Sequence, residues 1–331
     1  MVFREMEPPA RDSVKRMSPT LWALGSRMLC VKIGVAEAQQ LNTIASWKDG
    51  DSEFRLIPRD EALLVGFGEG DSAVDRIQEC GTGGSVFSIG NEAICKAKSW
   101  YEGRQLEGTT IEVVREQFPS VPLPEVLYSW NDPAMHRTFL ITRRVYARTL
   151  NAAWPDLSAS QRKTIAVEVA SHCASLASKT SSKYESDSGC GVLEYWLMDR
   201  VPMSVPTWWI TTLGPLTHSE LKKYLSSMSK EPIPLFGDAL VFCHADLGPT
   251  NILVSVDGNS VAAIIDWEVA GYFPDFWVAT KPATVRAFQL DEAAVGPQVV
   301  DEWPSLFVEA LVSKGFSCQK SVYQAWRSGR I

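Results

Sequence analysis

The spacing of hydrophobic and polar positions changes near residue 147 of this chain. Before it, short runs of alternating apolar and polar residues are separated by glycine, asparagine and proline, which is typical of strands joined by turns. We expect a three-stranded meander within residues 77–98 and further strands at Leu127–Trp130 and Thr138–Val145. A helix that Pro119 ends is expected between the meander and the strand at Leu127.

After residue 147 the apolar positions follow helical spacing. Three helices are predicted, at 160–178, 217–228 and 304–315, with Ser160 available to cap the first and the spacing from Thr217 to Glu220 matching a capping box. Gly315 is expected to end the third helix. A pair of strands near residues 252–265 interrupts these helices, so the pattern predicts a two-lobed α+β fold, with an N-lobe at 76–146 and a C-lobe at 147–331.

Residues 1–75 are the least readable part of the chain. The segment Thr20–Trp47 is compatible with a helix, and Phe54–Phe67 with one or two strands. We treat residues 1–75 as an N-terminal extension whose role is unclear from the sequence.

Composition and charge narrow the class of protein. The chain has 331 residues, 45% of them hydrophobic, which is enough for a large core. The net charge of −7 and the scattered basic residues speak against nucleic-acid binding. There is no apolar run of about 18 residues that would cross a membrane, no signal peptide is expected, and the seven cysteines lack a CxxC pair. A cytoplasmic protein with free thiols is the expectation.

The most informative stretch is VFCHADLGPTNILVSVDGNSVAAIIDWE, residues 241–268. The runs ILVSV and VAAII flank Asp257-Gly258, a strong hairpin signal. Folding that hairpin brings Asn251 and Asp266 close together at its open end, with Cα atoms on the order of 5 Å apart. An amide oxygen and a carboxylate in that position suit a hard cation such as Mg²⁺.

Asp246 precedes Asn251 by five residues and is expected to face the same pocket. A carboxylate that borders a metal without holding it can accept a proton from an attacking hydroxyl. His244 suits a role in bracing the loop by hydrogen bonds. Any one of these residues alone is more often a turn or cap residue, but H-x-D-x₄-N, a hairpin and then an aspartate follow the kinase catalytic template.

These residues give the chain a family resemblance. HADLGPTNILV followed by IIDWE resembles the signature of the aminoglycoside phosphotransferase and choline-kinase-like enzymes, and the chain is most similar to their fungal-type members. The resemblance covers about residues 77–315. It implies a two-lobed protein-kinase-like fold, with a β-rich N-lobe and a mostly helical C-lobe that carries a catalytic β-hairpin.

The resemblance also implies roles for residues of the C-lobe. Asp246 corresponds to the catalytic aspartate, with His244 beside it, and Asn251 and Asp266 correspond to the magnesium ligands. Three further residues near this motif, Glu268, Asp275 and Trp277, could contact an acceptor. For each of them a structural role in a loop, a helix cap or the core is an alternative.

In the N-lobe, Lys96 falls where the family's strand lysine contacts the α- and β-phosphates of ATP. Glu107 is the first choice for the helix glutamate that pairs with this lysine, and Glu112 the second. The phosphate-covering loop and the adenine-binding hinge correspond to further residues, Gly83, Gly84, Ser85, Thr142, Arg143 and Val145. Arg143 stands where the family often has an acidic residue, which leaves the choice of nucleotide open.

Two functions are compatible with the sequence. The first is a phosphotransferase that uses ATP and Mg²⁺ to phosphorylate a hydroxyl of a small-molecule acceptor. The alternative is a kinase-fold protein without phosphotransfer, either a nucleotide-binding regulator or a biosynthetic enzyme that uses the cleft for other acid–base chemistry.

Overall fold

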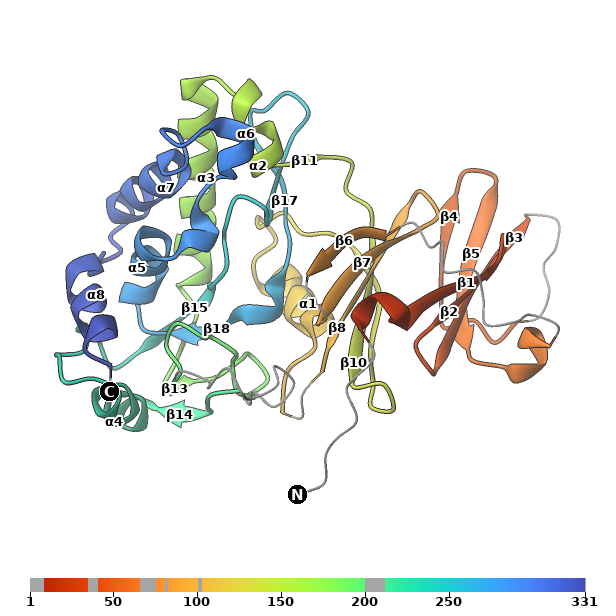
Figure 1. Ribbon diagram of the computed structural model, residues 1–331, viewed down its shortest axis with the longest axis horizontal. Coiled ribbons are helices and arrows are strands. Elements are labelled where there is room, and N and C mark those ends of the chain that lie inside the picture. The colour runs from red at the N-terminus through yellow and green to blue at the C-terminus, as the bar shows by residue number, and fades with distance from the viewer. Residues whose placement is uncertain are drawn as a thin grey trace. The chain divides into compact units, whose positions relative to one another are not determined.

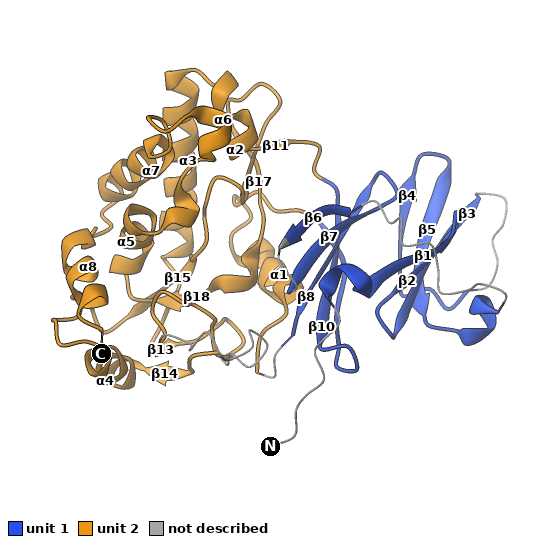
Figure 2. Ribbon diagram, viewed as in Figure 1, with its two compact units in different colours: residues 1–102, 125–144, 204–210 blue, residues 103–124, 145–203, 211–331 orange. Residues whose placement is uncertain are grey.

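The chain divides into two compact units in a computed structural model (Figures 1 and 2). The structure describes residues 9–34, 41–65, 76–80, 83–100, 103–199 and 212–330. Unit 1 comprises residues 1–102, 125–144 and 204–210, and unit 2 comprises residues 103–124, 145–203 and 211–331. Strands dominate the first unit and helices the second, so the α+β class expected from the sequence is confirmed. The proposed division at residues 75 and 146 stays a prediction.

Unit 1 is built from two five-stranded antiparallel sheets. The first has the order β1-β2-β3-β5-β4 and the second β6-β7-β8-β10-β9. The elements are η1 Ala10–Ser13, β1 Val14–Ser18, β2 Leu21–Leu24, β3 Met28–Gly34, β4 Ala45–Asp49, β5 Ser52–Pro58, η2 Glu61–Leu64, β6 Arg76–Cys80, β7 Gly84–Ile89, β8 Ala93–Ser99, β9 Val126–Asp132 and β10 Arg137–Arg143. The predicted meander and the two later strands are therefore confirmed.

The described part of Thr20–Trp47 contains strands and not the expected helix; residues 35–40 lie outside the described residues. Strands β2 and β3 and the start of β4 occupy this segment, and Gly25 makes the turn between the first two with a φ of 65°. The sheet wins over helical spacing because one face of these strands is buried against the second sheet. Trp22, Cys30 and Trp47 belong to the same hydrophobic cluster as Phe87 and Phe139.

Two buried carboxylates fasten the sheets of unit 1 to each other. Asp132, at the end of β9, accepts hydrogen bonds from the backbone N–H of Ser26 at 2.6 Å and from its hydroxyl at 2.7 Å. In the other direction Asp49, at the end of β4, accepts from the backbone N–H of Asn91 at 2.6 Å. Each sheet thus holds a turn of the other, and both turns contain a glycine with positive φ, Gly25 and Gly90.

Unit 2 is mostly helical with short strands. Its longer elements are α1 Glu107–Gln117, α3 Ala159–Leu176, α4 His218–Ser227, β15 Leu240–His244, β16 Ile252–Val254, β17 Val261–Ile264, β18 Ala270–Phe273, α5 Phe276–Thr284, α7 Glu302–Ser313 and α8 Lys320–Ser328. Its shorter elements are β11 Arg148–Thr149, α2 Leu150–Ala153, η3 Trp154–Asp156, β12 Thr180–Ser181, β13 Lys183–Tyr184, β14 Leu216–Thr217, η5 Trp267–Val269, η6 Arg286–Phe288 and α6 Glu292–Val295.

The helix signals of unit 2 are local, and most of them hold. Thr217 forms the predicted capping box with Glu220 at the start of α4. The cap of α3 is Ser158 and not Ser160, because Ser158 accepts from the N–H of Gln161 while the Gln161 side chain accepts from the Ser158 N–H. Among the described residues, no helix has both the length and the apolar character that a membrane span requires.

Candidate active site

The loop between β15 and β16, residues 244–251, is fixed by hydrogen bonds to its own side chains. The backbone N–H of Asp246 donates to Nδ1 of His244 at 3.2 Å, so Nε2 of this ring carries the proton and donates to the carbonyl of Ile265 at 2.9 Å. Asn251 Nδ2 donates to the carbonyl of Asp246 at 2.8 Å. Both ends of the loop are hydrogen-bonded to Ile265, after β17: His244 donates to its carbonyl, and the N–H of Ile265 donates to the carbonyl of Asn251.

His244 braces this loop in its neutral form. It is 4% exposed and its ring meets the ring of Trp267 edge-on, with centroids 4.5 Å apart. Burial is the main cause that lowers the pKa of His244 below its ordinary value of 6.5, against the opposing effect of Asp246. The geometry agrees with the bracing role expected from the sequence.

The side chain of Asp246 is partly exposed, with 32% of it accessible to solvent. Its Oδ2 lies 3.3 Å from Nδ2 of Asn251, and its Oδ1 lies 4.0 Å from Nζ of Lys281. Gly248 packs its backbone against η6, since a Cβ atom there would lie 2.6 Å from the carbonyl oxygen of Ala287. The carboxylate is thus presented by a loop whose backbone is closely packed.

The predicted hairpin is present as β16 and β17, paired with Ile252 opposite Ile264. The ladder has a register shift between Leu253 and Val254. The N–H that donates to the carbonyl of Asn251, at 2.9 Å, belongs to Ile265. Asp266 follows directly in the left-handed region, with a φ of 68°. It stands next to the expected position at the open end of the hairpin.

Three carboxylates gather beside this end of the hairpin. Glu107, Asp266 and Glu268 each offer an oxygen, and these oxygens lie within 4.8 Å of one another. Glu107, at the start of α1, also accepts from the backbone N–H of Trp267 at 3.1 Å, and Glu268 pairs with Arg104 at 3.1 Å. An all-oxygen set of this kind fits a hard divalent cation such as Mg²⁺, which neutralises the gathered negative charge.

The predicted partner of Lys96 is therefore placed in unit 2. Glu107 lies with Asp266 and Glu268 there, while Glu112 lies further along α1 on its exposed side. The pairing of either glutamate with Lys96 stays a prediction.

In unit 1, Lys96 lies on the face of β8 opposite to the buried Cys95 and Ala97. Its neighbours across the sheet are Val86 on β7 and Leu140 on β10. The face that carries Lys96 is thus the one that the first sheet of unit 1 does not cover.

The glycine turn before β7 is described in part. Gly83 lies in the turn and its carbonyl accepts from the N–H of Ser99 at 2.8 Å, while Gly84 starts β7. The side chain of Ser85 is 1% exposed and lies on the covered face, opposite Ala97. Ser85 thus lies in β7 with its hydroxyl on the covered face, and its role in phosphate binding stays a prediction.

The segment expected to bind adenine begins within β10, whose last two residues are Thr142 and Arg143. Thr142 is buried, and the arginine after it, Arg143, pairs with Glu125 at 2.7 Å on the surface of unit 1. Arg144 donates to the carbonyl of Asn91 at 2.6 Å and to the hydroxyl of Ser88. Val145 is the first residue of unit 2 after this segment. Each of the two adjacent cations thus has its own partners in unit 1: a carboxylate for Arg143, and a carbonyl and a hydroxyl for Arg144.

Two residues considered for acceptor contact have structural roles. Asp275 caps α5, where its side chain accepts from the N–H of Phe276 at 3.0 Å. Trp277 is 1% exposed and its Nε1–H donates to Glu194 at 3.2 Å, which fits the core role given as the alternative, so its contact with an acceptor stays a prediction.

Two buried charged residues near Asp246 were missed by the sequence reasoning. Glu194 is 1% exposed and Lys281 is 4% exposed, and they form an ion pair of 2.6 Å. They are 87 residues apart along the chain, and neither belongs to a recognisable motif. Only the fold could have revealed them.

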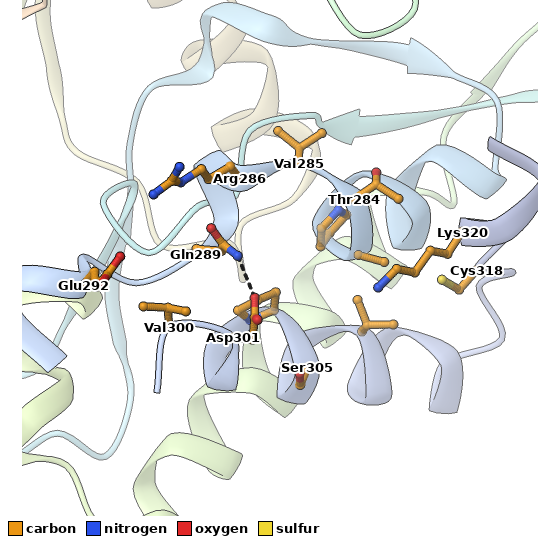
Figure 3. A pocket seen from close by; sticks show the side chains of 14 residues that line it. Thr284, Val285, Arg286, Gln289, Glu292, Val300, Asp301, Ser305, Cys318 and Lys320 are labelled. Carbon is orange, nitrogen blue, oxygen red and sulfur yellow. Dashed lines mark hydrogen bonds between the residues drawn. The ribbon is translucent and has the colours of Figure 1, made fainter. Parts of the chain in front are cut away.

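A separate pocket of about 780 Å³ lies on unit 2 between α5, η6 and α7 (Figure 3). Its polar lining includes Arg286, Gln289, Asp301 and Lys320, and Gln289 donates to Asp301 at 2.8 Å. None of the residues proposed above for catalysis or metal binding lines it. This pocket is distinct from the loop that carries Asp246.

Comparison with known proteins identifies the region that contains this loop. The model of the phosphotransferase enzyme family matches residues 213–294, which include Asp246, Asn251, Asp266 and Glu268. The chain resembles this phosphotransferase family. The resemblance expected from the sequence is therefore confirmed, at the level of a small-molecule phosphotransferase family. A search of curated proteins finds no match.

Several solved structures resemble the chain at low identity. One is aminoglycoside-3'-phosphotransferase of type VIII, with 17% identity, a TM-score of 0.48 and coverage of 76% of this chain and 90% of that one. Another is aminoglycoside phosphotransferase APH(3'')-Id from Streptomyces rimosus, with 17% identity, a TM-score of 0.42 and coverage of 78% and 92%. A third is a thermostable mutant of APH(4)-Ia in ternary complex with AMP-PNP and hygromycin B, with 19% identity, a TM-score of 0.42 and coverage of 81% and 96%.

Proposed function

We propose that this protein transfers the γ-phosphoryl group of ATP to a hydroxyl of a small molecule, with Asp246 as the base. The observation that carries the proposal is the Asp246 carboxylate, exposed at 32%, whose own backbone is held by hydrogen bonds with the side chains of His244 and Asn251. It lies in the segment that matches the phosphotransferase family. A carboxylate held in this way can accept the proton of an acceptor hydroxyl as the oxygen attacks phosphorus.

The residues of each unit have distinct roles in this proposal. In unit 2, Asn251 and Asp266 would hold Mg²⁺, with the carboxylate of Glu107 or Glu268 adding negative charge beside it. Asn251 uses its Nδ2–H on Asp246, which leaves its amide oxygen for a cation. When bound, Mg²⁺ supplies charge neutralisation for the transferring phosphoryl group. In unit 1, Lys96 and the backbone at Gly83 and Gly84 would bind phosphates.

The direct test is release of ADP from Mg·ATP in the presence of a panel of alcohols, amines and hydroxy acids. We expect at least one alcohol to stimulate ADP release. Asp246→Asn should lower turnover by a factor of about 10² to 10⁴, because a general base contributes about that much. Asp238→Asn, an aspartate whose side chain is 99% exposed, is the matched control and should leave turnover unchanged.

Binding of the nucleotide is measured separately by thermal shift. At a ligand concentration of 100 times Kd the free energy of unfolding should rise by about 2.7 kcal/mol, in the wild type and in Asp246→Asn alike. Binding without ADP release from any acceptor would instead favour a nucleotide-binding regulator. Neither binding nor release would favour other acid–base chemistry on this fold.

A further inference from the structure

Lys281 is a buried lysine next to the proposed base. It lies on α5, and its side chain is 5% exposed. Its Nζ is 2.6 Å from Oε2 of Glu194 and 4.0 Å from Oδ1 of Asp246. The first distance is a charge-assisted hydrogen bond, and the second is a charge contact without a hydrogen bond.

Glu194 is the buried partner of this lysine. Its Oε2 accepts from Lys281 and from Nε1 of Trp277 at 3.2 Å, and its Oε1 accepts from the N–H of Trp196 at 3.2 Å. The neighbouring thiol of Cys243 does not compete for this role, because burial raises its pKa well above the ordinary value and keeps it neutral. A carboxylate with three donors is the arrangement in which a buried ion pair is tolerated.

The two oxygens of Asp246 therefore face different partners. Oδ2 faces Nδ2 of Asn251 at 3.3 Å, and Oδ1 faces Lys281. Rotation of the carboxylate out of this plane would move Oδ1 away from Lys281 and Oδ2 away from the amide of Asn251. The amide on one side and the cation on the other favour one orientation of the carboxylate plane.

We propose that Lys281 is a positioning residue for the phosphotransfer, which orients the carboxylate of Asp246, with Glu194 as its buried counter-ion. This inference rests on the proposed function. A buried ion pair is often no more stable than two well-packed apolar side chains. We assign this pair a positioning role because its lysine lies beside the carboxylate of Asp246. The competing interpretation is that the pair only fastens the segment around Glu194 to α5.

The decisive variant removes both charges at once. Lys281→Met alone leaves Glu194 buried without a counter-ion, which can unfold the protein for reasons unrelated to catalysis. Lys281→Met combined with Glu194→Gln keeps both side-chain lengths and leaves no unpaired charge. The matched control is Arg162→Met with Glu302→Gln, which removes another ion pair of unit 2, with a separation of 2.8 Å.

Each variant is assayed for its melting temperature, its KM for Mg·ATP and its kcat for ADP release with the best acceptor of the panel. For the Lys281 and Glu194 double variant we expect cooperative melting, a KM within about twofold of the wild type and a kcat lower by about 10-fold to 100-fold, the effect of a misplaced reacting group. The control pair should keep its kcat. In an Asp246→Asn background the same double change should have almost no further effect on kcat, because residues that act through one group are not additive.

A double variant that melts cooperatively with wild-type kcat would overturn the inference, and so would an equal loss of kcat in the Asp246→Asn background. Lys281→Arg keeps the charge and the ion pair, and the adjoining cavity of about 20 Å³ gives its larger head room. We expect it to retain kcat within about tenfold of the wild type. An arginine variant that melts normally but is as slow as the double variant also contradicts the inference. If the wild type releases no ADP with any acceptor, the proposed function itself fails.

Discussion

Removal of residues 1–75 should prevent unit 1 from folding. The sequence suggests that these residues are an extension, and a deletion that spares every proposed site residue tests that view directly. In the structure the first sheet covers one face of the second. Trp22, Leu24, Phe54 and Leu56 belong to one hydrophobic cluster with residues of β7 to β10.

The magnitude follows from the side chains that the deletion exposes. Five large side chains of the second sheet are at most 5% exposed, namely Phe87, Ile89, Trp130, Phe139 and Ile141. Each contributes about 1.5 to 3 kcal/mol when buried, so about 8 to 15 kcal/mol depends on the first sheet, as an upper estimate. Asp132 would in addition lose both of its hydrogen bonds from Ser26. The loss is comparable to the whole stability of a typical domain, about 5 to 15 kcal/mol.

The assay compares residues 76–331 with the full chain by solubility, binding of a hydrophobic dye and thermal unfolding. We expect the shortened chain to aggregate or to bind dye, without a cooperative transition for unit 1. Removal of residues 1–8, which precede η1, is the control and should leave the transition unchanged. A soluble 76–331 chain with cooperative unfolding and a normal thermal shift with Mg·ATP would refute this reasoning.

Three further predictions concern single residues. Gly248→Ala places a methyl group 2.6 Å from the carbonyl of Ala287 and should cost about 1 to 3 kcal/mol by chemical denaturation, whereas Gly237→Ala, with nothing within 4 Å, is the neutral control. The lowered pKa of His244 means that the unfolded chain binds a proton that the folded chain does not; stability is full above pH 6.5 and falls as the pH drops toward the lowered value. His244→Gln should therefore flatten the melting temperature below pH 6.5, and an unchanged slope would contradict the assignment. Asp132→Asn should lower the free energy of unfolding, measured in urea, by about 1.5 to 3 kcal/mol. The NH₂ group of the asparagine would face the N–H or the hydroxyl of Ser26, both of which donate to the carboxylate.

The parts that could be predicted from the sequence depend on short-range chemistry. The hairpin at β16 and β17 follows from two apolar runs around Asp257-Gly258, and the structure has Gly258 there with a φ of 70°. The capping box of Thr217 is equally local, since its two partners lie three residues apart. The order of a β-rich region followed by helices could also be predicted from the sequence, because the spacing of apolar residues within each element is a local signal.

The failures have a different origin. The helix expected at Thr20–Trp47 had acceptable spacing, and only the second sheet, far along the chain, makes these residues strands. The contact of Asp132 with Ser26 spans 106 residues, and that of Lys281 with Glu194 spans 87. Neither has a local signal.

The catalytic loop shows how a base can be exposed and still be held in place. A flexible exposed aspartate would lose the advantage of position, which is a large part of the catalysis expected in phosphoryl transfer. Here the groups that fix the loop are the neutral ring of His244 and the amide of Asn251, which hold the backbone on both sides of Asp246. The carbonyl of Asn251 in turn accepts from Ile265, so the loop and the end of the hairpin form one hydrogen-bonded unit. The bond from the Asp246 N–H needs an unprotonated Nδ1 on His244, so protonation of this ring would release one side of the loop.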